Sequence, residues 1–154
     1  MSHALLERAH LLARAGSPSA GTLSFDFDGV VMDHSSGWQD GDLYGAPIPG
    51  AVEELQRRIA GGWSVVIQTA RDPRFHDEVA AWIRRHTGLE TVVSARRHTY
   101  WSGSTVLVTN VKPGALSYVD DNAIRFDLAA GGWQTALAGL PFARAEVLAP
   151  GVRP

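Results

Sequence analysis

The stretch Leu23-Ser24-Phe25-Asp26-Phe27-Asp28-Gly29-Val30 decides how the rest of the chain is interpreted. Its first half has the composition of a buried strand, yet it carries one aspartate and runs straight into a second. Two carboxylates at the end of a buried strand repel each other and lose water, and a bound metal or a shared proton relieves that cost. Taken alone, the pattern is equally compatible with two acids that cap a turn at Gly29.

Further polar groups follow other apolar runs along the chain. Thr69 comes directly after a Val- and Ile-rich run, Lys112 lies just past another, and Asp120-Asp121 end a third. In open α/β sheets, ligands bind at the carboxyl ends of the strands. If these runs are neighbouring parallel strands, the polar groups converge at one edge of the sheet without any further assumption.

The alternation of strand and helix patterns predicts an α/β fold. We expect a three-layer α/β/α sandwich with a mainly parallel, Rossmann-like sheet, forming one domain over residues 22–154 after an N-terminal helical extension, residues 1–21. Residues 32–50 are rich in Gly and Pro and predict a long loop of the kind that is often functional. The expected strands are 23–27, 64–68, 91–94, 105–109 and 116–119, and the expected helices are about 3–15, 51–60 and 73–87.

Composition places the chain among ordinary globular proteins. It has 154 residues, 45% hydrophobic and 19% charged, with a formal net charge of −2 and no cysteine. Disulfides, thiolate catalysis and cysteine-based zinc sites are therefore excluded, and no basic excess indicates nucleic acid or an anionic membrane. No apolar stretch is long enough to span a bilayer, and charged residues interrupt the first fifteen positions, so we expect a cytoplasmic protein without membrane partners.

The lysine at position 112 is the only lysine in the chain, while the remaining basic side chains are Arg and His. One interpretation is an ordinary surface lysine before Pro113. The other is a compact point charge that a planar guanidinium cannot replace, placed to hold both a nucleophile and a phosphoryl group.

The full set of groups suits a divalent metal and a phosphoryl group. Functionally, Asp26 would be nucleophile and metal ligand and Asp28 the general acid/base, with Asp120 and Asp121 completing a Mg²⁺ site of hard oxygen ligands. Thr69 would donate its hydroxyl to a phosphoryl oxygen, although an isolated Thr is usually only a strand residue. The candidate sets are catalytic Asp26, Asp28, Thr69 and Lys112; metal-binding Asp26, Asp28, Asp120 and Asp121; and substrate-binding Thr69, Ala70, Arg71 and Lys112.

Two side chains carry an open alternative. Arg71 either binds substrate phosphate or pairs with Asp72 or Glu78, and the structural role is slightly favoured. His34, in the long loop, either faces the site or is exposed to solvent, and the exposed loop position is the simpler expectation.

The ordered motifs Asp26-Phe27-Asp28-Gly29-Val30, Thr69, Lys112-Pro113 and Asp120-Asp121 together resemble the four sequence motifs of the haloacid dehalogenase (HAD) superfamily. The resemblance spans about residues 23 to 126. It implies a Mg²⁺-dependent phosphatase with Asp26 as nucleophile, Asp28 as acid/base, Thr69 and Lys112 as phosphoryl stabilisers and Asp120 as the second metal-binding carboxylate. Residues 32–50 are too few for a folded cap domain, so the chain is similar to capless members.

We therefore expect a phosphomonoester hydrolase that acts on a phosphorylated substrate the sequence does not name. A regulator that binds phosphate or metal without turnover is a second interpretation. A phosphatase of nucleic-acid ends or nucleotides is a third, indicated by Arg96, Arg97, Tyr100 and Trp101 and disfavoured by the near-neutral charge.

Overall fold

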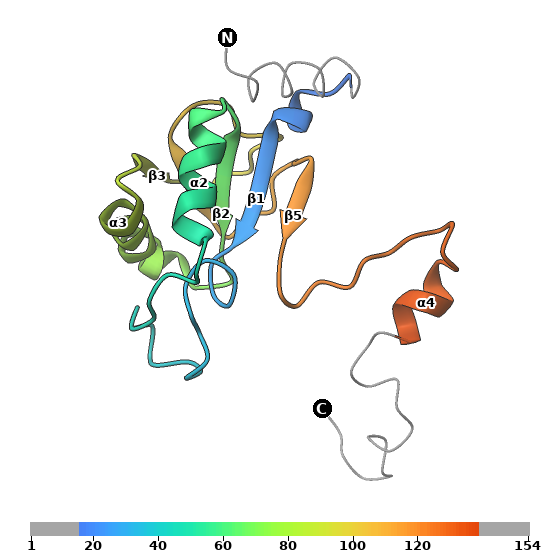
Figure 1. The fold of residues 1–154 in the computed structure, drawn as a ribbon, viewed down its shortest axis with the longest axis horizontal. Coiled ribbons are helices and arrows are strands. Elements are labelled where there is room, and N and C mark those ends of the chain that lie inside the picture. The colour runs from blue at the N-terminus through green and yellow to red at the C-terminus, as the bar shows by residue number, and fades with distance from the viewer. Residues whose placement is uncertain (1–15, 139–154) are drawn as a thin grey trace. The chain divides into compact units, whose positions relative to one another are not determined.

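The computed structural model describes residues 16–138, which contain a parallel sheet and its covering helices (Figure 1). The sheet has five strands in the order β3-β4-β2-β1-β5, and every pairing is parallel. The predicted α/β class with a parallel, Rossmann-like sheet is thus confirmed. The strands are β1 (Thr22–Asp26), β2 (Ser64–Gln68), β3 (Thr91–Val93), β4 (Val106–Thr109) and β5 (Ser117–Val119).

The register of the central strands brings their carboxyl ends level. Asp26 at the end of β1 lies opposite Gln68 of β2, and Gln68 lies opposite Thr109 of β4. On the other side, Phe25 of β1 lies opposite Val119 of β5, so the next residue of each strand is an aspartate. The residues that follow these strands therefore start from one edge of the sheet, toward which the arrows of β1 and β5 point together in Figure 1.

Both long helices cover the same face of this sheet. Helix α2 (Ala51–Ala60) buries Leu55, and helix α3 (His76–Thr87) buries Trp82 and Ile83. These side chains join alternate strand residues such as Phe25 and Ile67 in one hydrophobic core. The helix predicted over 51–60 is confirmed at both ends. The helix predicted from residue 73 begins as a 3₁₀ turn, η2 (Pro73–Phe75), before α3.

Loop segments cover the opposite face of the sheet. Ser24, Val66 and Leu107 point to that face because side chains alternate along a strand. The Thr22 hydroxyl donates to the Trp101 carbonyl at 2.9 Å, and Gly103 N donates to the Ser64 hydroxyl at 3.2 Å. Within residues 16–121, the expected third layer is therefore built from loop and not from α-helix.

The chain divides into two compact units, Met1–Asp121 and Asn122–Pro154. The boundary falls inside the range that the sequence predicts as one domain, 22–154. The second unit contains the short helix α4 (Trp133–Ala138). The first unit begins, in its described part, with the 3₁₀ turn η1 (Pro18–Gly21), whereas the helix predicted near 3–15 lies outside the described residues. No helix in the described part of the chain is long and apolar enough to cross a membrane.

We expect Leu55→Ala to destabilise the fold by about 2–5 kcal/mol, because it leaves a cavity between α2 and the sheet. Leu55 is 1% exposed, whereas Leu116 is 45% exposed. Leu116→Ala is therefore the matched control, and urea denaturation should show it within about 0.5 kcal/mol of the wild type. Equal losses in the two variants would contradict the assignment of Leu55 to the core.

Candidate metal and phosphoryl site

Three carboxylates meet at the carboxyl edge of the sheet. Asp26 ends β1, while Asp120 and Asp121 follow β5, and one oxygen from each lies within 4.8 Å of the others. The cause is the parallel pairing of Phe25 with Val119, which makes Asp26 and Asp120 neighbours on adjacent strands. Clustered carboxylates of this kind are the ligands that Mg²⁺ prefers in proteins.

The environment of Asp26 disfavours its charged form. Burial of the carboxyl raises its pKa to about 6, and the negative charges of Asp120, Asp121 and Asp28 add to the increase. The backbone N–H of Phe27, which donates to Asp26 Oδ1 at 2.9 Å, acts in the opposite direction. A cation placed among these acids would remove the repulsion, so the cluster fits a divalent metal on charge as well as on ligand type.

A tight turn carries the chain away from Asp26 and makes room for Asp121. Gly29 has a φ of +81°, and its N–H donates to the Met32 carbonyl at 2.9 Å. A Cβ at this position would lie 2.5 Å from Asp121 Oδ2. Gly29 is therefore required both by the left-handed backbone and by the close approach of a carboxylate of the cluster.

Thr69 lies at the end of β2, as predicted, and is buried. Its N–H donates to the Thr109 carbonyl at 3.0 Å, and its hydroxyl oxygen accepts from Arg71 N at 3.1 Å. Because the oxygen acts as acceptor in that bond, the hydroxyl proton remains for a second partner. Ala70 is exposed beside it, so the backbone at this strand end can be reached by a ligand.

Lys112 is exposed, and its ammonium lies 4.4 Å from the centre of the Tyr118 ring. Tyr118 is held in turn by its hydroxyl, which donates to the Pro113 carbonyl. Tyr118 belongs to β5, which ends at Val119, the residue before Asp120. Lys112 is thus held by a cation–π contact with a residue of the strand that Asp120 follows.

Asp28 is engaged differently from the other acids. Its Oδ2 accepts from Arg71 Nε at 2.8 Å and its Oδ1 from Arg71 Nη2 at 2.7 Å, a bidentate ion pair. The partners expected for Arg71 from the sequence, Asp72 and Glu78, are therefore wrong: the ion pair is long-range, and spacing along α3 could not reveal it. The Asp28 carboxylate faces Arg71, which leaves the backbone carbonyl as the route by which Asp28 would serve a metal.

The long loop after β1 contributes contacts near the first acid motif. His34 Nδ1 lies 3.4 Å from Asp28 Oδ1 and its side chain is 27% exposed, which agrees with the alternative that this histidine faces the acid motif and not with a fully exposed loop position. The Gly41 carbonyl accepts from Arg71 Nη1 at 2.7 Å, and the Arg71 guanidinium lies 4.9 Å from the Trp38 ring centre. For the contacts of Gly41 and Trp38, the length of the loop was the only signal in the sequence.

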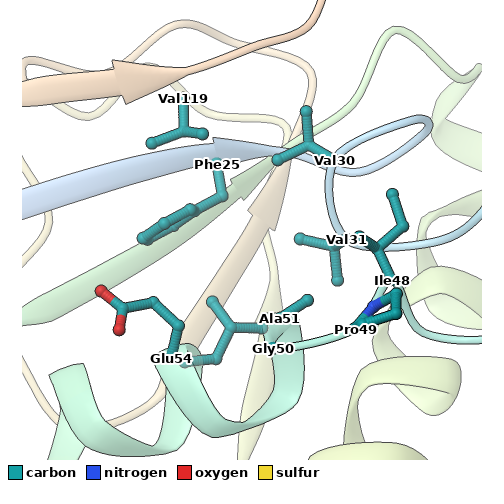
Figure 2. A pocket seen from close by; sticks show the side chains of 10 residues that line it. Phe25, Val30, Val31, Ile48, Pro49, Gly50, Ala51, Glu54 and Val119 are labelled. Atoms are coloured by element: carbon teal, nitrogen blue, oxygen red, sulfur yellow. The ribbon is translucent and has the colours of Figure 1, made fainter.

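An apolar pocket lies between the sheet and α2, beside the residues that flank the acid motifs in the sequence (Figure 2). It has a volume of about 170 Å³. Phe25 and Val119 contribute from β1 and β5, Val30 from the turn and Ala51 from the start of α2, with Glu54 at its border. Phe25 and Val119, which directly precede Asp26 and Asp120 in the sequence, are thus apolar and face the helical layer. The carboxylates of Asp26 and Asp120 are left to face the edge of the sheet.

The chain shows no match to a protein-family model, a curated protein or a solved structure. The interpretation of the site therefore depends on its geometry and on the residues that form it.

We expect Mg²⁺ to stabilise the protein through the acid cluster, raising the melting temperature by roughly 3–8 °C at millimolar metal. Asp120→Asn removes one ligand charge and should abolish most of this shift, whereas Asp77→Asn, an exposed position on α3, should keep it. Thermal melts with Mg²⁺ and with EDTA make the comparison. Asp26→Asn should lose the shift and also raise the melting temperature of the metal-free protein at about pH 8.

The expected rise in the melting temperature of metal-free Asp26→Asn at about pH 8 follows from the raised pKa of Asp26. A carboxyl whose folded-state pKa exceeds its unfolded value costs no stability below the unfolded value and its full cost above the folded value, here about 6. Replacement by a neutral amide removes the cost, so the benefit should disappear at about pH 4. A metal-free Asp26→Asn protein that is less stable than wild type at both pH values would contradict the repulsion argument.

Gly29→Ala should weaken the Mg²⁺-induced shift without removing any ligand, because the added methyl group would displace Asp121. Gly88→Ala serves as the control: its φ is also positive, +70°, and nothing lies within 4 Å of the added atom. Both variants should lose a similar amount of metal-free stability, about 1 kcal/mol. Equal Mg²⁺ titrations in the two proteins would show that Asp121 takes no part in binding.

Proposed function

We propose that the protein is a Mg²⁺-dependent phosphomonoester hydrolase that acts through an aspartyl-phosphate intermediate on Asp26. The observation that carries the proposal is the convergence of the Asp26, Asp120 and Asp121 carboxylates at the carboxyl end of the sheet, where Thr69 follows β2. A metal held there supplies a Lewis acid for the phosphoryl oxygens. The capless HAD-type arrangement belongs to the same proposal, supported by the four motifs and by a β1–α2 connection that contains no helix.

The chain's own residues would divide the reaction into two displacements. A carboxylate oxygen of Asp26 attacks phosphorus, the bond to the leaving oxygen breaks, and Asp28 delivers a proton to that oxygen. Water then attacks the phosphoryl group while Asp28 takes its proton, and Asp26 is released as carboxylate with inorganic phosphate. Thr69 and Lys112 balance charge on the phosphoryl oxygens in both steps.

A regulator that keeps its phosphate is the second candidate, and one observation favours it. Both oxygens of Asp28 accept hydrogen bonds from the Arg71 guanidinium, and a carboxylate held in this way is a poorer proton donor. Such a protein would complete the first displacement with an activated phosphate donor and stop there. The two candidates share the metal site and Asp26, so turnover distinguishes them.

The enzyme should hydrolyse p-nitrophenyl phosphate with Mg²⁺ and lose turnover with EDTA. We expect Asp26→Asn to reduce kcat by a factor on the order of 10⁴ or more, because the attacking carboxylate is gone. Asp28→Asn should also abolish steady turnover, since no group then protonates the leaving oxygen. Asp77→Asn is the matched control and should retain full activity, because the residue is exposed on α3.

The outcomes separate the two functions. A wild-type protein that forms a stable phosphoprotein with acetyl phosphate and shows no turnover is the regulator. Retention of one tenth or more of the wild-type rate in Asp26→Asn would exclude Asp26 as the nucleophile under either function.

A further inference from the structure

The Arg71 side chain is the most completely enclosed charge of the described residues near the candidate site, with 2% of its surface exposed. A guanidinium that binds a substrate phosphate must be reachable from solvent before the substrate arrives. The contacts of Arg71 are instead intramolecular: two N–H groups donate to Asp28 and a third donates to the Gly41 carbonyl. Aromatic rings lie near the guanidinium as well, Trp38 at 4.9 Å and Phe27 at 5.8 Å.

The backbone of Arg71 is held as firmly as its side chain. Its N–H donates to the Thr69 hydroxyl at 3.1 Å, and its carbonyl lies 3.0 Å from His76 Nε2. Because a carbonyl can only accept, His76 is the donor in that bond and carries its proton on Nε2. The guanidinium therefore starts from an anchored backbone, and its position relative to Thr69 is defined by covalent geometry.

The other end of the contact is a closed loop, residues 33–46. Its base is pinned where Asp33 N donates to the Ala46 carbonyl at 2.9 Å. Its far side meets Phe75, the last residue of η2, at Gly41, whose φ is +97° and whose missing Cβ would overlap the Phe75 ring. Only glycine lets the Gly41 carbonyl approach Arg71 in this way, so loop 33–46 is built to reach the guanidinium.

We infer that Arg71 is a positioning residue, which ties the Asp28 carboxylate and loop 33–46 into one unit and does not bind the phosphoryl group. A planar guanidinium can hold both oxygens of a carboxylate and a carbonyl at fixed angles, which a single ammonium cannot do. The tie fixes the orientation of the Asp28 carboxylate, with His34 Nδ1 3.4 Å from Asp28 Oδ1 and the Trp38 ring centre 4.9 Å from the guanidinium. The catalytic part of this inference rests on the proposed hydrolase activity, whereas the tie itself does not.

The test compares Arg71→Lys with Gly41→Ala, which breaks the loop contact without touching the guanidinium. Amide hydrogen exchange followed by mass spectrometry reports on residues 33–46. In both variants we expect exchange there to speed up about tenfold or more, as the loss of charge-assisted hydrogen bonds implies, while β1 and β2 stay protected. Arg74→Lys is the matched control: Arg74 is exposed, 4.0 Å from Asp72, and its exchange pattern should equal the wild type's.

Kinetics with p-nitrophenyl phosphate supply the second readout. Arg71→Lys and Gly41→Ala should each lower kcat about tenfold to a hundredfold with KM nearly unchanged, because Asp28 is misaligned while phosphate contacts remain. A raised KM in Arg71→Lys with unchanged loop exchange would overturn the inference and make Arg71 a phosphate ligand. If the wild type shows no turnover, the proposed hydrolase fails, and the exchange data alone decide whether Arg71 ties the loop.

Discussion

The parallel pairing of β1 with β5 is the constraint on which the candidate site depends. It sets Phe25 opposite Val119, and the residues that follow each strand are then acids held against each other at the sheet edge. Burial raises the pKa of Asp26 to about 6. The strand order therefore brings carboxylates together at a place where burial disfavours the charged form of Asp26. Sites that work against stability in this way are more often functional than structural, and the hydrophobic layer under α2 and α3 offsets the cost.

The two aspartates of the first motif have different partners in this geometry. Asp26 belongs to the cluster of acids, whereas Asp28, two residues later, faces a buried guanidinium. The turn at Gly29 separates them, because its left-handed backbone redirects the chain and leaves space for Asp121. Two carboxylates with different partners have different electrostatic surroundings, as acid/base and nucleophilic roles require.

The loop after β1 connects β1 to α2 and also contacts Asp28 and Arg71. It is closed at its base, packs Gly41 against Phe75 of η2, and brings His34 to Asp28. Its exposed aromatic residues, Trp38 and Tyr44, would be among the first groups a substrate meets. Under the proposed function, selection of the leaving group would fall to this loop, since the β1–α2 connection contains no helical element.

Much of the architecture was determined by the sequence alone. The Val- and Ile-rich runs, the Gly that ends α2 and the Asp72-Pro73 start of the following helix defined nearly every strand and helix, because these signals are local. The convergence of Asp26 with Asp120 was also predictable, since it requires only parallel strands with level ends. The spacing of residues in the sequence is enough to predict both the secondary-structure elements and this convergence.

Tertiary structure alone decided the partners of Arg71 and His34 and the layer on the second face of the sheet. Arg71 meets Asp28 across 43 positions of sequence, a contact that no helical periodicity encodes. Within residues 16–121, the irregular chain around Trp101 covers the second face, and the hydrogen bond from Thr22 to the Trp101 carbonyl depends on a path that local propensity does not specify. Local signals define elements, while long-range ion pairs and loop paths depend on how the completed sheet places distant residues side by side.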